Sequence, residues 1–411
     1  MGSRSVPAGS AWPKSLKLAW KTNVGEGHSS PVVAGERVFV FARQGEVEQL
    51  LSLDLATGRV IWRQGEPVPY TMNPAAMGHG KGPKSTPAVR DGKAYTLGIS
   101  GILTCREAAS GRLVWRKDSR GRFREASPTY GAAQSPLLDG GFVIVHVGGP
   151  GDGALTAFDA NTGAVKWEWK GDGPAYASPV VAEVAGVRQV VAFTEGHLVG
   201  LSAASGALLW KLPFTTEYTQ NAVTPVVRGS TVYYSGLDKG VHAVEIVRRG
   251  DGFSAEPRWS NTEVSAYMSA PVLDGDALYG LSHRKKGQLF ALDARSGRAL
   301  WTSDGRQGDN ASLVVAGDAL VVVTTEAESR SSRVRRLQIR PALASKTMRA
   351  KCTSLVFASC LPWSCSASAS SSYFRVQRAR LATSFTRKPA GTTARWAQTG
   401  LSATVYLARG A

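Results

Sequence analysis

Residues Leu155–Trp167 read "LTAFDANTGAVKW", and this stretch decides the fold. Its centre predicts a tight turn, because an Asp159 carboxylate and a Thr162 hydroxyl can accept hydrogen bonds from turn N–H groups, while Gly163 can adopt positive φ without steric cost. The strand that follows carries Trp167. A ring of that size removes about 150 to 250 Å² from water when it is buried. We therefore expect Trp167 to fill a gap against a neighbouring sheet.

The same pattern recurs along the chain at a regular period. Good copies end at Trp62, Trp115, Trp167, Trp210 and Trp301, a degenerate copy ends at Trp259, and Trp20 ends the shorter segment "LKLAW". Successive tryptophans lie between 42 and 53 residues apart. A period in this range indicates a repeat architecture in which each unit buries its apolar surface against the next one.

Each unit also carries an earlier marker, which is a proline followed by two short apolar runs that a polar or glycine turn separates. These prolines are Pro31, Pro87, Pro136, Pro179, Pro225 and Pro271. The runs are rich in Val, Tyr and Phe, and no 3.6-residue apolar period lies between them. Four strands in a repeat of about 45 residues predict the blade of a β-propeller. We therefore predict an all-β fold of four-stranded antiparallel blades.

The consensus "L-x-A-L-D-A-x-T-G-x-x-x-W" resembles the PQQ-like (pyrrolo-quinoline quinone) repeat. This repeat occurs in the quinoprotein alcohol dehydrogenase-like superfamily and in the BamB-like outer-membrane assembly lipoproteins. The resemblance covers roughly residues 12 to 328 and points to the non-enzymatic, BamB-like branch. Members of that group are bacterial and usually exported, so the resemblance implies a periplasmic or exported location.

Ring closure sets the expected number of blades. Six units run from Pro31 to Trp301, and a seventh begins at Ala311 and could take its outer strand from Val334–Ile339. If Trp20 lies on the outer strand of the last blade, the N-terminal strand closes the ring and removes its free edges. Arg395–Gly410 could supply two more strands. We predict eight blades with a poorly formed last one, and seven blades as the alternative.

The positive charge is concentrated at one end of the chain. The net charge is +18, but residues 329–411 hold 15 Lys and Arg and no Asp or Glu. This tail could be a nucleic-acid-binding arm, a flexible solvated segment, or a stretch translated out of frame. Its Ser-, Arg- and Ala-rich composition, with the apolar "LVFASCLPW", favours the third reading. We predict a 1–15 extension, a 16–328 propeller and an aberrant, largely disordered 329–411 tail, with no nucleic-acid partner.

Other sequence features limit the location and the assembly. No run of about 18 apolar residues occurs, so no transmembrane segment is expected. The first residues lack the apolar core of a signal peptide, which leaves a cytoplasmic location open. Cys105 is the one cysteine before residue 329, so no disulfide framework is expected there. We expect a monomer that binds protein partners.

Ligands of propellers usually bind where the loops that lead into the innermost strands converge. Polar side chains stand shortly before the marker prolines and before the seventh unit. They are His28, Lys84, Gln134, Tyr176, Asn221, Tyr267 and Asn310. These side chains could ring the mouth of a channel and bind an anion or a polar peptide. Alternatively, they cap strand ends and pair with one another.

Catalytic and metal-binding signatures are missing from the sequence. It contains no adjacent cysteine pair and no haem CxxCH motif. The glycine-rich stretch 77–85, "MGHGKGPKS", leads into a predicted strand, whereas a phosphate-binding loop opens a helix. We therefore nominate no catalytic residue and no metal ligand, and we expect no cofactor. PQQ with calcium belongs only to the alternative reading.

Three functions remain open. The favoured hypothesis is a non-catalytic scaffold of the bacterial cell envelope that engages protein partners through its inter-blade loops. The second is a PQQ-dependent, dehydrogenase-like enzyme. The third is a sensor that binds a sugar or another small ligand without turnover.

Overall fold

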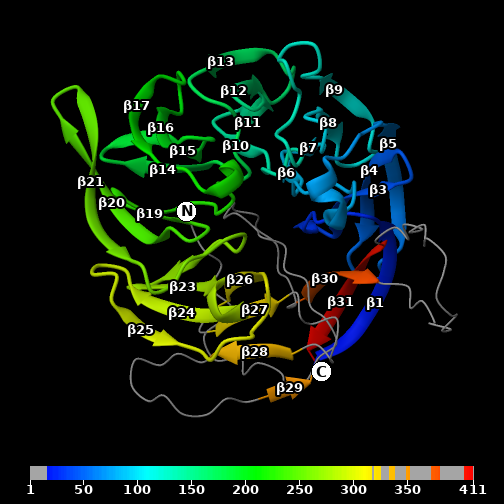
Figure 1. Cartoon of the computed structure of the whole chain (residues 1–411). Coiled ribbons are helices and arrows are strands. Elements are labelled where there is room, and N and C mark those ends of the chain that lie inside the picture. The colour runs from blue at the N-terminus through cyan, green and yellow to red at the C-terminus, as the bar shows by residue number, and fades with distance from the viewer. Residues whose placement is uncertain are drawn as a thin grey trace, which may run out of the picture.

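The computed structural model describes residues 16–316, 319–324, 333–337, 349–351, 372–379 and 402–410, with side chains over 18–315 and 320–324. Within these residues the strands form seven four-stranded sheets and one three-stranded sheet. The sheets stand side by side in a ring, with one edge of each toward the centre (Figure 1). The predicted eight-bladed β-propeller is confirmed.

The first six blades are antiparallel meanders in chain order. Blades 1 and 2 contain β2 (Val32–Ala34), β3 (Arg37–Gln44), β4 (Val47–Asp54), β5 (Val60–Pro67), β6 (Ala88–Arg90), β7 (Lys93–Leu97), β8 (Leu103–Glu107) and β9 (Leu113–Lys117). Blades 3 and 4 contain β10 (Leu137–Asp139), β11 (Phe142–Gly149), β12 (Asp152–Asp159), β13 (Val165–Trp169), β14 (Val180–Val184), β15 (Val187–Phe193), β16 (His197–Ser202) and β17 (Leu208–Pro213). Blades 5 and 6 contain β18 (Val226–Arg228), β19 (Thr231–Gly236), β20 (Gly240–Arg249), β21 (Gly252–Asn261), β22 (Val272–Asp274), β23 (Ala277–Ser282), β24 (Gln288–Asp293) and β25 (Ala299–Thr302).

The seventh blade differs in detail from the prediction. It contains β26 (Ala311–Ala316), β27 (Ala319–Thr324), β28 (Arg333–Leu337) and β29 (Arg349–Lys351). The run "VRRLQI", which was expected to form the outer strand, provides the third strand instead. The reason is topological, because in a meander the first run after the second strand must pair beside it.

The eighth blade closes the ring as predicted. Its strand order is β1 (Leu16–Gly25), β31 (Ser402–Gly410) and β30 (Ser372–Ala379), with the N-terminal strand antiparallel to β31. Arg395–Gly410 was expected to give two strands, but its described part gives only β31, whose nine residues pair along the ten of β1. The second C-terminal strand comes from Ser372–Ala379. The remaining residues of 329–411 and residues 1–15 lie outside the described residues, so the frame-shift and domain hypotheses stay predictions.

The turn in the opening motif forms as the residue types predict. Asp159 Oδ1 accepts hydrogen bonds from the N–H groups of Asn161 and Thr162, both at 2.9 Å. Gly163 has φ +69°. The carboxylates of Asp54 and Asp293 accept equivalent bonds in blades 1 and 6. The turn therefore repeats because the same local chemistry repeats.

Five tryptophans dock on the turn of the following blade in the same way. Each indole Nε1 donates to a backbone carbonyl in that turn, and a glycine three residues beyond the carbonyl lies against the ring. The pairs are Trp20 with Leu55 and Gly58, Trp62 with Ala108 and Gly111, Trp115 with Ala160 and Gly163, Trp167 with Ala203 and Gly206, and Trp259 with Ala294 and Gly297. The donor–acceptor distances are 3.0–3.2 Å. These rings join consecutive blades.

Trp210 takes a different partner because blade 5 has a different outer hairpin. Strands β20 and β21 are both ten residues long and replace the short turn with an extended arm, visible at the left of Figure 1. The Trp210 indole instead donates to Gln189 Oε1 at 2.7 Å and packs in one buried cluster with Ile246 and Phe253 of the arm. The degenerate repeat in the sequence corresponds to this arm.

The core is a series of apolar clusters that lie between neighbouring blades. One cluster joins Tyr95 and Leu97 of blade 2 to Val143 and Val145 of blade 3. Both faces of the middle strands are covered, so successive residues of strands such as β3 and β11 are apolar. The helices of the described part are three short 3-10 turns in loops: η1 (Pro74–His79), η2 (Glu217–Thr219) and η3 (Arg284–Lys286). None of the described helices is long and apolar enough to cross a membrane.

Candidate functional site

The inner strands are tied together where the marker prolines begin them. The residue before the proline carries a hydroxyl in five blades, and these residues, Ser30, Thr86, Ser135, Ser178 and Thr224, form what we call the collar. Each N–H donates to the hydroxyl of the next member, from Ser30 to Thr86 at 3.1 Å and onward at 3.0, 2.9 and 3.3 Å. The series ends before Ala270, which has no hydroxyl. Four hydrogen bonds thus hold five blades in register around the channel mouth.

Two of the predicted site residues support the mouth from within. Gln134 is buried and pairs with the backbone of His146 in β11, donating to its carbonyl at 2.7 Å and accepting from its N–H at 2.8 Å. Asn221 is fully buried, and its amide donates to the carbonyls of Thr194 and Phe214 at 2.8 and 3.0 Å. For these two residues the pairing hypothesis describes the contacts.

Lys84 and Tyr176 both contact Tyr130, which is not among the predicted site residues. The Lys84 ammonium donates to the backbone carbonyl of Tyr130 at 2.5 Å, and the Tyr130 N–H donates to the Tyr176 hydroxyl at 3.3 Å. The rings of Tyr130 and Tyr176 lie 5.9 Å apart. Burial lowers the pKa of Lys84 to about 8. Three inter-blade loops therefore converge on Tyr130.

The other predicted residues are spread around the mouth. His28 is exposed, and its Nε2 lies 2.8 Å from the His79 carbonyl oxygen. The Tyr267 hydroxyl donates to Gln220 Oε1 of the preceding loop. Asn310 is half-buried before β26. His28 thus contacts the loop that precedes blade 2, and Tyr267 contacts the loop that precedes blade 5. The seven side chains do not all meet at one point.

Tyrosines from five loops gather over the mouth, and we call Tyr70, Tyr130, Tyr176, Tyr218 and Tyr267 the tyrosine cluster. Burial raises the pKa of Tyr176 and of Tyr267, and the nearby Tyr130 raises both further. A hydrogen bond with Glu217 raises the pKa of Tyr218, and Tyr130 adds to that rise. Tyr70 acts on Tyr176 in the same way. The Tyr130 and Tyr176 rings are in contact, and the Tyr267 hydroxyl reaches Gln220 on the loop that carries Tyr218, so these loops lie side by side in pairs.

Exposed apolar side chains lie on the same loops. Met77, Tyr218 and Met268 are 48%, 64% and 41% exposed. Tyr218 and Thr219 also have positive φ values of 58° and 53°, which non-glycine residues rarely adopt. The mouth therefore presents aromatic and thioether surface to solvent.

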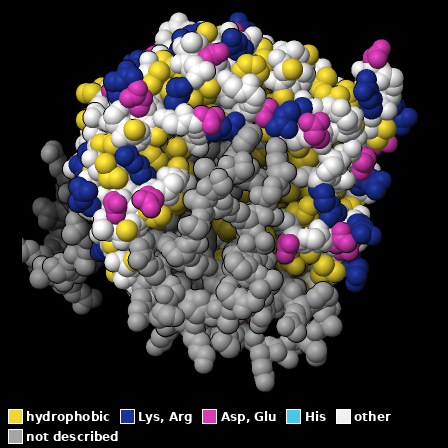
Figure 2. Space-filling view, turned by 180° about the vertical axis from the view of Figure 1, so that it is seen from behind, with side chains coloured by type: hydrophobic (Ala, Val, Ile, Leu, Met, Phe, Trp, Pro, Cys, Tyr) yellow, Lys and Arg dark blue, Asp and Glu magenta, His cyan; other side chains and the backbone are white. Residues whose placement is uncertain are grey.

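The charges on the face shown in Figure 2 are mixed. On the face shown in Figure 2, basic and acidic side chains are interspersed, and no broad area of one sign stands out among the coloured residues. A protein that follows a nucleic-acid backbone needs a continuous basic stripe. The view gives no support for such a stripe on this face.

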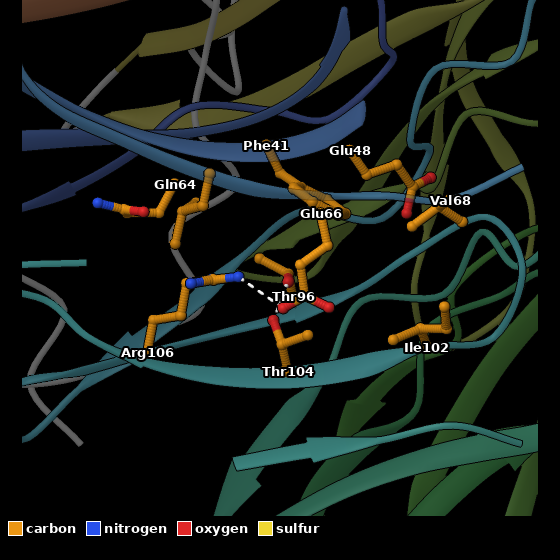
Figure 3. A pocket seen from close by; sticks show the side chains of 10 residues that line it. Phe41, Glu48, Gln64, Glu66, Val68, Thr96, Ile102, Thr104 and Arg106 are labelled. Atoms are coloured by element: carbon orange, nitrogen blue, oxygen red, sulfur yellow. Dashed lines mark hydrogen bonds and ion pairs between the residues drawn. The ribbon is translucent and has the colours of Figure 1, made fainter. Parts of the chain in front are cut away.

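A small cavity lies between blades 1 and 2 (Figure 3). Glu48 lines it from β4, and Thr104 and Arg106 line it from β8. Burial raises the pKa of Glu48 to about 7, although its bond from the Ile99 N–H and the nearby Arg43 act in the opposite direction. Arg106 pairs with Glu66 at 2.9 Å. These polar groups already have protein partners, so the cavity serves the blade interface.

The described part of the chain offers no metal centre. Among its residues, no three His, Cys, Asp or Glu side chains gather closely enough to hold an ion.

Comparisons with known proteins agree with the fold and with the repeat. The sequence model of the family "Outer membrane protein assembly factor BamB" matches two overlapping stretches, residues 11–76 and 51–303. The relative of that name from Shewanella oneidensis is 28% identical over 243 residues, which are 56% of this chain and 59% of that protein. The chain thus spans about three fifths of that relative's length.

Two further comparisons define the range of the likeness. The dehydrogenase subunit of the quinone alcohol dehydrogenase of Komagataeibacter europaeus is 31% identical over 163 residues, 38% of this chain and 21% of that protein. The crystal structure of BamB from Moraxella catarrhalis superposes with a TM-score of 0.61 at 15% identity, covering 96% of this chain and 97% of that one. At this identity the superposition shows the shared fold.

Proposed function

Because the chain belongs to the family of the outer membrane protein assembly factor BamB, we propose that it is a non-catalytic propeller scaffold of the bacterial cell envelope. Its location would be periplasmic, and its role would be to hold protein partners. The name of the Shewanella oneidensis relative supports assembly of outer membrane proteins as the process. We propose the channel mouth as the docking surface.

The observation that carries this proposal is the composition of the mouth. Tyrosine and methionine are enriched at protein–protein interfaces, while Lys, Glu and Asp are depleted there. Tyrosine supplies a large amphipathic contact area and loses little conformational entropy on binding. Tyr218 and Met268, both exposed, stand on neighbouring loops beside the buried part of the tyrosine cluster. This is the arrangement of an anchor patch.

The collar makes the mouth suitable for docking. Rigid surfaces bind with a smaller loss of entropy than mobile ones. The collar hydrogen bonds and the amide of Asn221 fix the bases of the loops that carry Tyr176 and Tyr218. A partner would therefore meet an ordered surface.

Site-specific photo-crosslinking in living cells tests the proposal. A photoreactive amino acid is placed at Tyr218 or Met268 and, as matched controls, at Leu113 or Leu208, which are similarly exposed on outer strands. We expect the mouth positions to crosslink to one outer membrane protein that mass spectrometry identifies. Crosslinks from Leu113 and Leu208, with none from Tyr218 or Met268, would mean that the partner docks on the outer strands instead of the mouth.

The dehydrogenase alternative rests on a shorter likeness, that to the Komagataeibacter europaeus subunit. PQQ with Ca²⁺ should raise the melting temperature of the protein and support dye reduction if this alternative is correct. The scaffold proposal predicts neither effect. The sugar-sensor hypothesis stays a prediction, which a thermal-shift screen with sugars can test.

A further inference from the structure

Lys84 differs from its neighbour Lys81 in how its charge is balanced. Lys81 pairs with Glu46 Oε1 at 3.3 Å. Lys84 forms no ion pair with any carboxylate of the described residues, and its ammonium donates to the Tyr130 carbonyl. An ammonium carries three donors. The single bond to a neutral carbonyl leaves donors of Lys84 available beside Tyr130 of the tyrosine cluster.

Such an arrangement is unfavourable in the free protein. A charge that is removed from water destabilises the fold unless an opposite charge or several hydrogen bonds compensate it. Burial alone lowers the pKa of Lys84, and no nearby acid opposes that shift. Half-buried ammonium groups without a counter-ion are candidates for functional sites, since a binding anion supplies the missing charge.

We propose that Lys84 binds the carboxylate of an acidic side chain in an extended segment of the partner protein, an inference that rests on the proposed function. The segment lies across the channel mouth. Its neighbouring apolar or aromatic side chains pack on Tyr130, Tyr176 and Tyr218. An ammonium and a carboxylate form a charge-assisted hydrogen bond, which is about twice as strong as a neutral one.

The surroundings favour one carboxylate over a more highly charged group. Lys84 is one cation, whereas phosphate sites commonly use a planar arginine or several donors. The partner chemistry is therefore an Asp or Glu flanked by apolar residues.

The test uses two blocked peptides as probes of the full-length protein. One has glutamate between two phenylalanines, and the other has glutamine in its place. We follow the ¹³Cε signal of Lys84 by NMR and measure affinity by calorimetry. The glutamate peptide should bind roughly ten- to hundredfold more tightly and shift the Lys84 signal, as a charged hydrogen bond predicts. Lys84→Met should abolish this preference, and Lys81→Met should preserve it.

The outcomes separate this inference from the proposed function. Equal affinities for the two peptides in the wild-type protein, or an unmoved Lys84 signal at saturation, would overturn the carboxylate inference. The wild-type NMR titration does not depend on the stability of any variant. If crosslinking from Tyr218 then persists in Lys84→Met, docking at the mouth stands while the role of Lys84 fails. If Tyr218 gives no crosslink but the peptide preference holds, the carboxylate site stands without the docking proposal.

Discussion

At the residue scale, each docked tryptophan is fixed by two contacts that require different chemistry in the next blade. The indole N–H needs a backbone carbonyl, as Trp115 finds at Ala160, 3.1 Å away. The ring face needs a residue without Cβ, since a Cβ on Gly163 would lie 2.8 Å from the Trp115 ring. The glycine of the turn motif therefore serves both the positive φ and the close approach of the ring.

Substitution of Gly163 by alanine should separate these two roles. Gly140 is the matched control, because it has φ +52° but nothing within 4 Å of its would-be Cβ. We expect Gly140→Ala to lower the free energy of unfolding by about 1 kcal/mol from backbone strain. Gly163→Ala should lower it by a further ~1 to 3 kcal/mol from overpacking. Equal losses in urea denaturation would show that the ring contact contributes nothing.

Two buried titratable groups should affect stability with opposite signs. Burial lowers the pKa of His146 to about 4, so its contribution is present above the unfolded pKa of about 6.5 and is lost as pH falls toward 4. Burial raises the pKa of Glu48 to about 7, so its contribution is present below about 4.5 and is lost as pH rises through 7. Between pH 4.5 and 6.5, the two groups therefore change the free energy of unfolding with pH in opposite directions.

Single variants separate the two slopes. Between pH 4.5 and 6.5, buried His146 makes the free energy of unfolding increase with pH, and His146→Gln should remove this increase. Buried Glu48 makes the free energy of unfolding decrease with pH, and Glu48→Gln should remove this decrease. Denaturant titrations at several pH values measure both slopes. Changes of the same sign in the two variants would contradict the burial assigned to one of them.

Residue types alone could predict the Trp period and the Asp–Thr–Gly turn, because both depend on local chemistry. They could not separate Gln134 and Asn221 from Lys84, since all three are polar residues near a marker proline. The difference lies in the backbone groups that the fold places around each side chain. Tyr70, Tyr130 and Tyr218 were missed, although a tyrosine in several of the long inter-blade loops was a visible signal.

At the element scale, the hydroxyl before each marker proline explains why that dipeptide repeats. The proline immediately precedes the inner strand, and the Ser or Thr before it accepts a bond from the preceding blade. The sequence showed the proline but not the inter-blade bond, because the bond joins residues more than 40 positions apart. The same limit applies to the β20–β21 arm, whose packing on Trp210 depends on a neighbouring blade.

Removal of one collar hydroxyl should weaken the inner ring. Ser135→Ala deletes the acceptor of the Thr86 N–H, and we expect a loss of about 1 kcal/mol in the free energy of unfolding. The control is Ser205→Ala, because Ser205 is exposed in a turn and accepts a longer bond of 3.4 Å. Chemical denaturation of both variants gives the comparison. An equal effect of the two substitutions would mean that the collar bonds do not contribute to stability.

At the scale of the whole molecule, the ring is closed by the two ends of the chain. Strand β1 pairs with β31, and Trp20 docks on the turn of blade 1 at Gly58. Closure removes the exposed strand edges of an open ring, which are prone to aggregate. Cyclic closure was predictable from the early position of Trp20, and strands were expected within Val334–Ile339 and Arg395–Gly410. Strands β29 and β30 were not predicted, because their sequence lacks the repeat markers.

Disruption of the Trp20 contact should open the ring. Trp20→Ala should lower the free energy of unfolding by about 3 to 5 kcal/mol, as large aromatic truncations in cores do. Leu18→Ala on the same strand, at a position 60% exposed, should change it by less than about 0.5 kcal/mol. Light scattering should detect aggregation of the Trp20 variant. A monomeric Trp20→Ala protein of wild-type stability would contradict the closure assigned to β1.

The central functional claim is that a partner protein docks on the channel mouth. Hydrogen–deuterium exchange of the protein, free and bound to the partner that crosslinking identifies, tests this claim most directly. We predict protection on binding in loops 214–225 and 262–271, with little change in outer strands β9 and β17. Protection confined to the outer strands, with both loops unchanged, would contradict the claim.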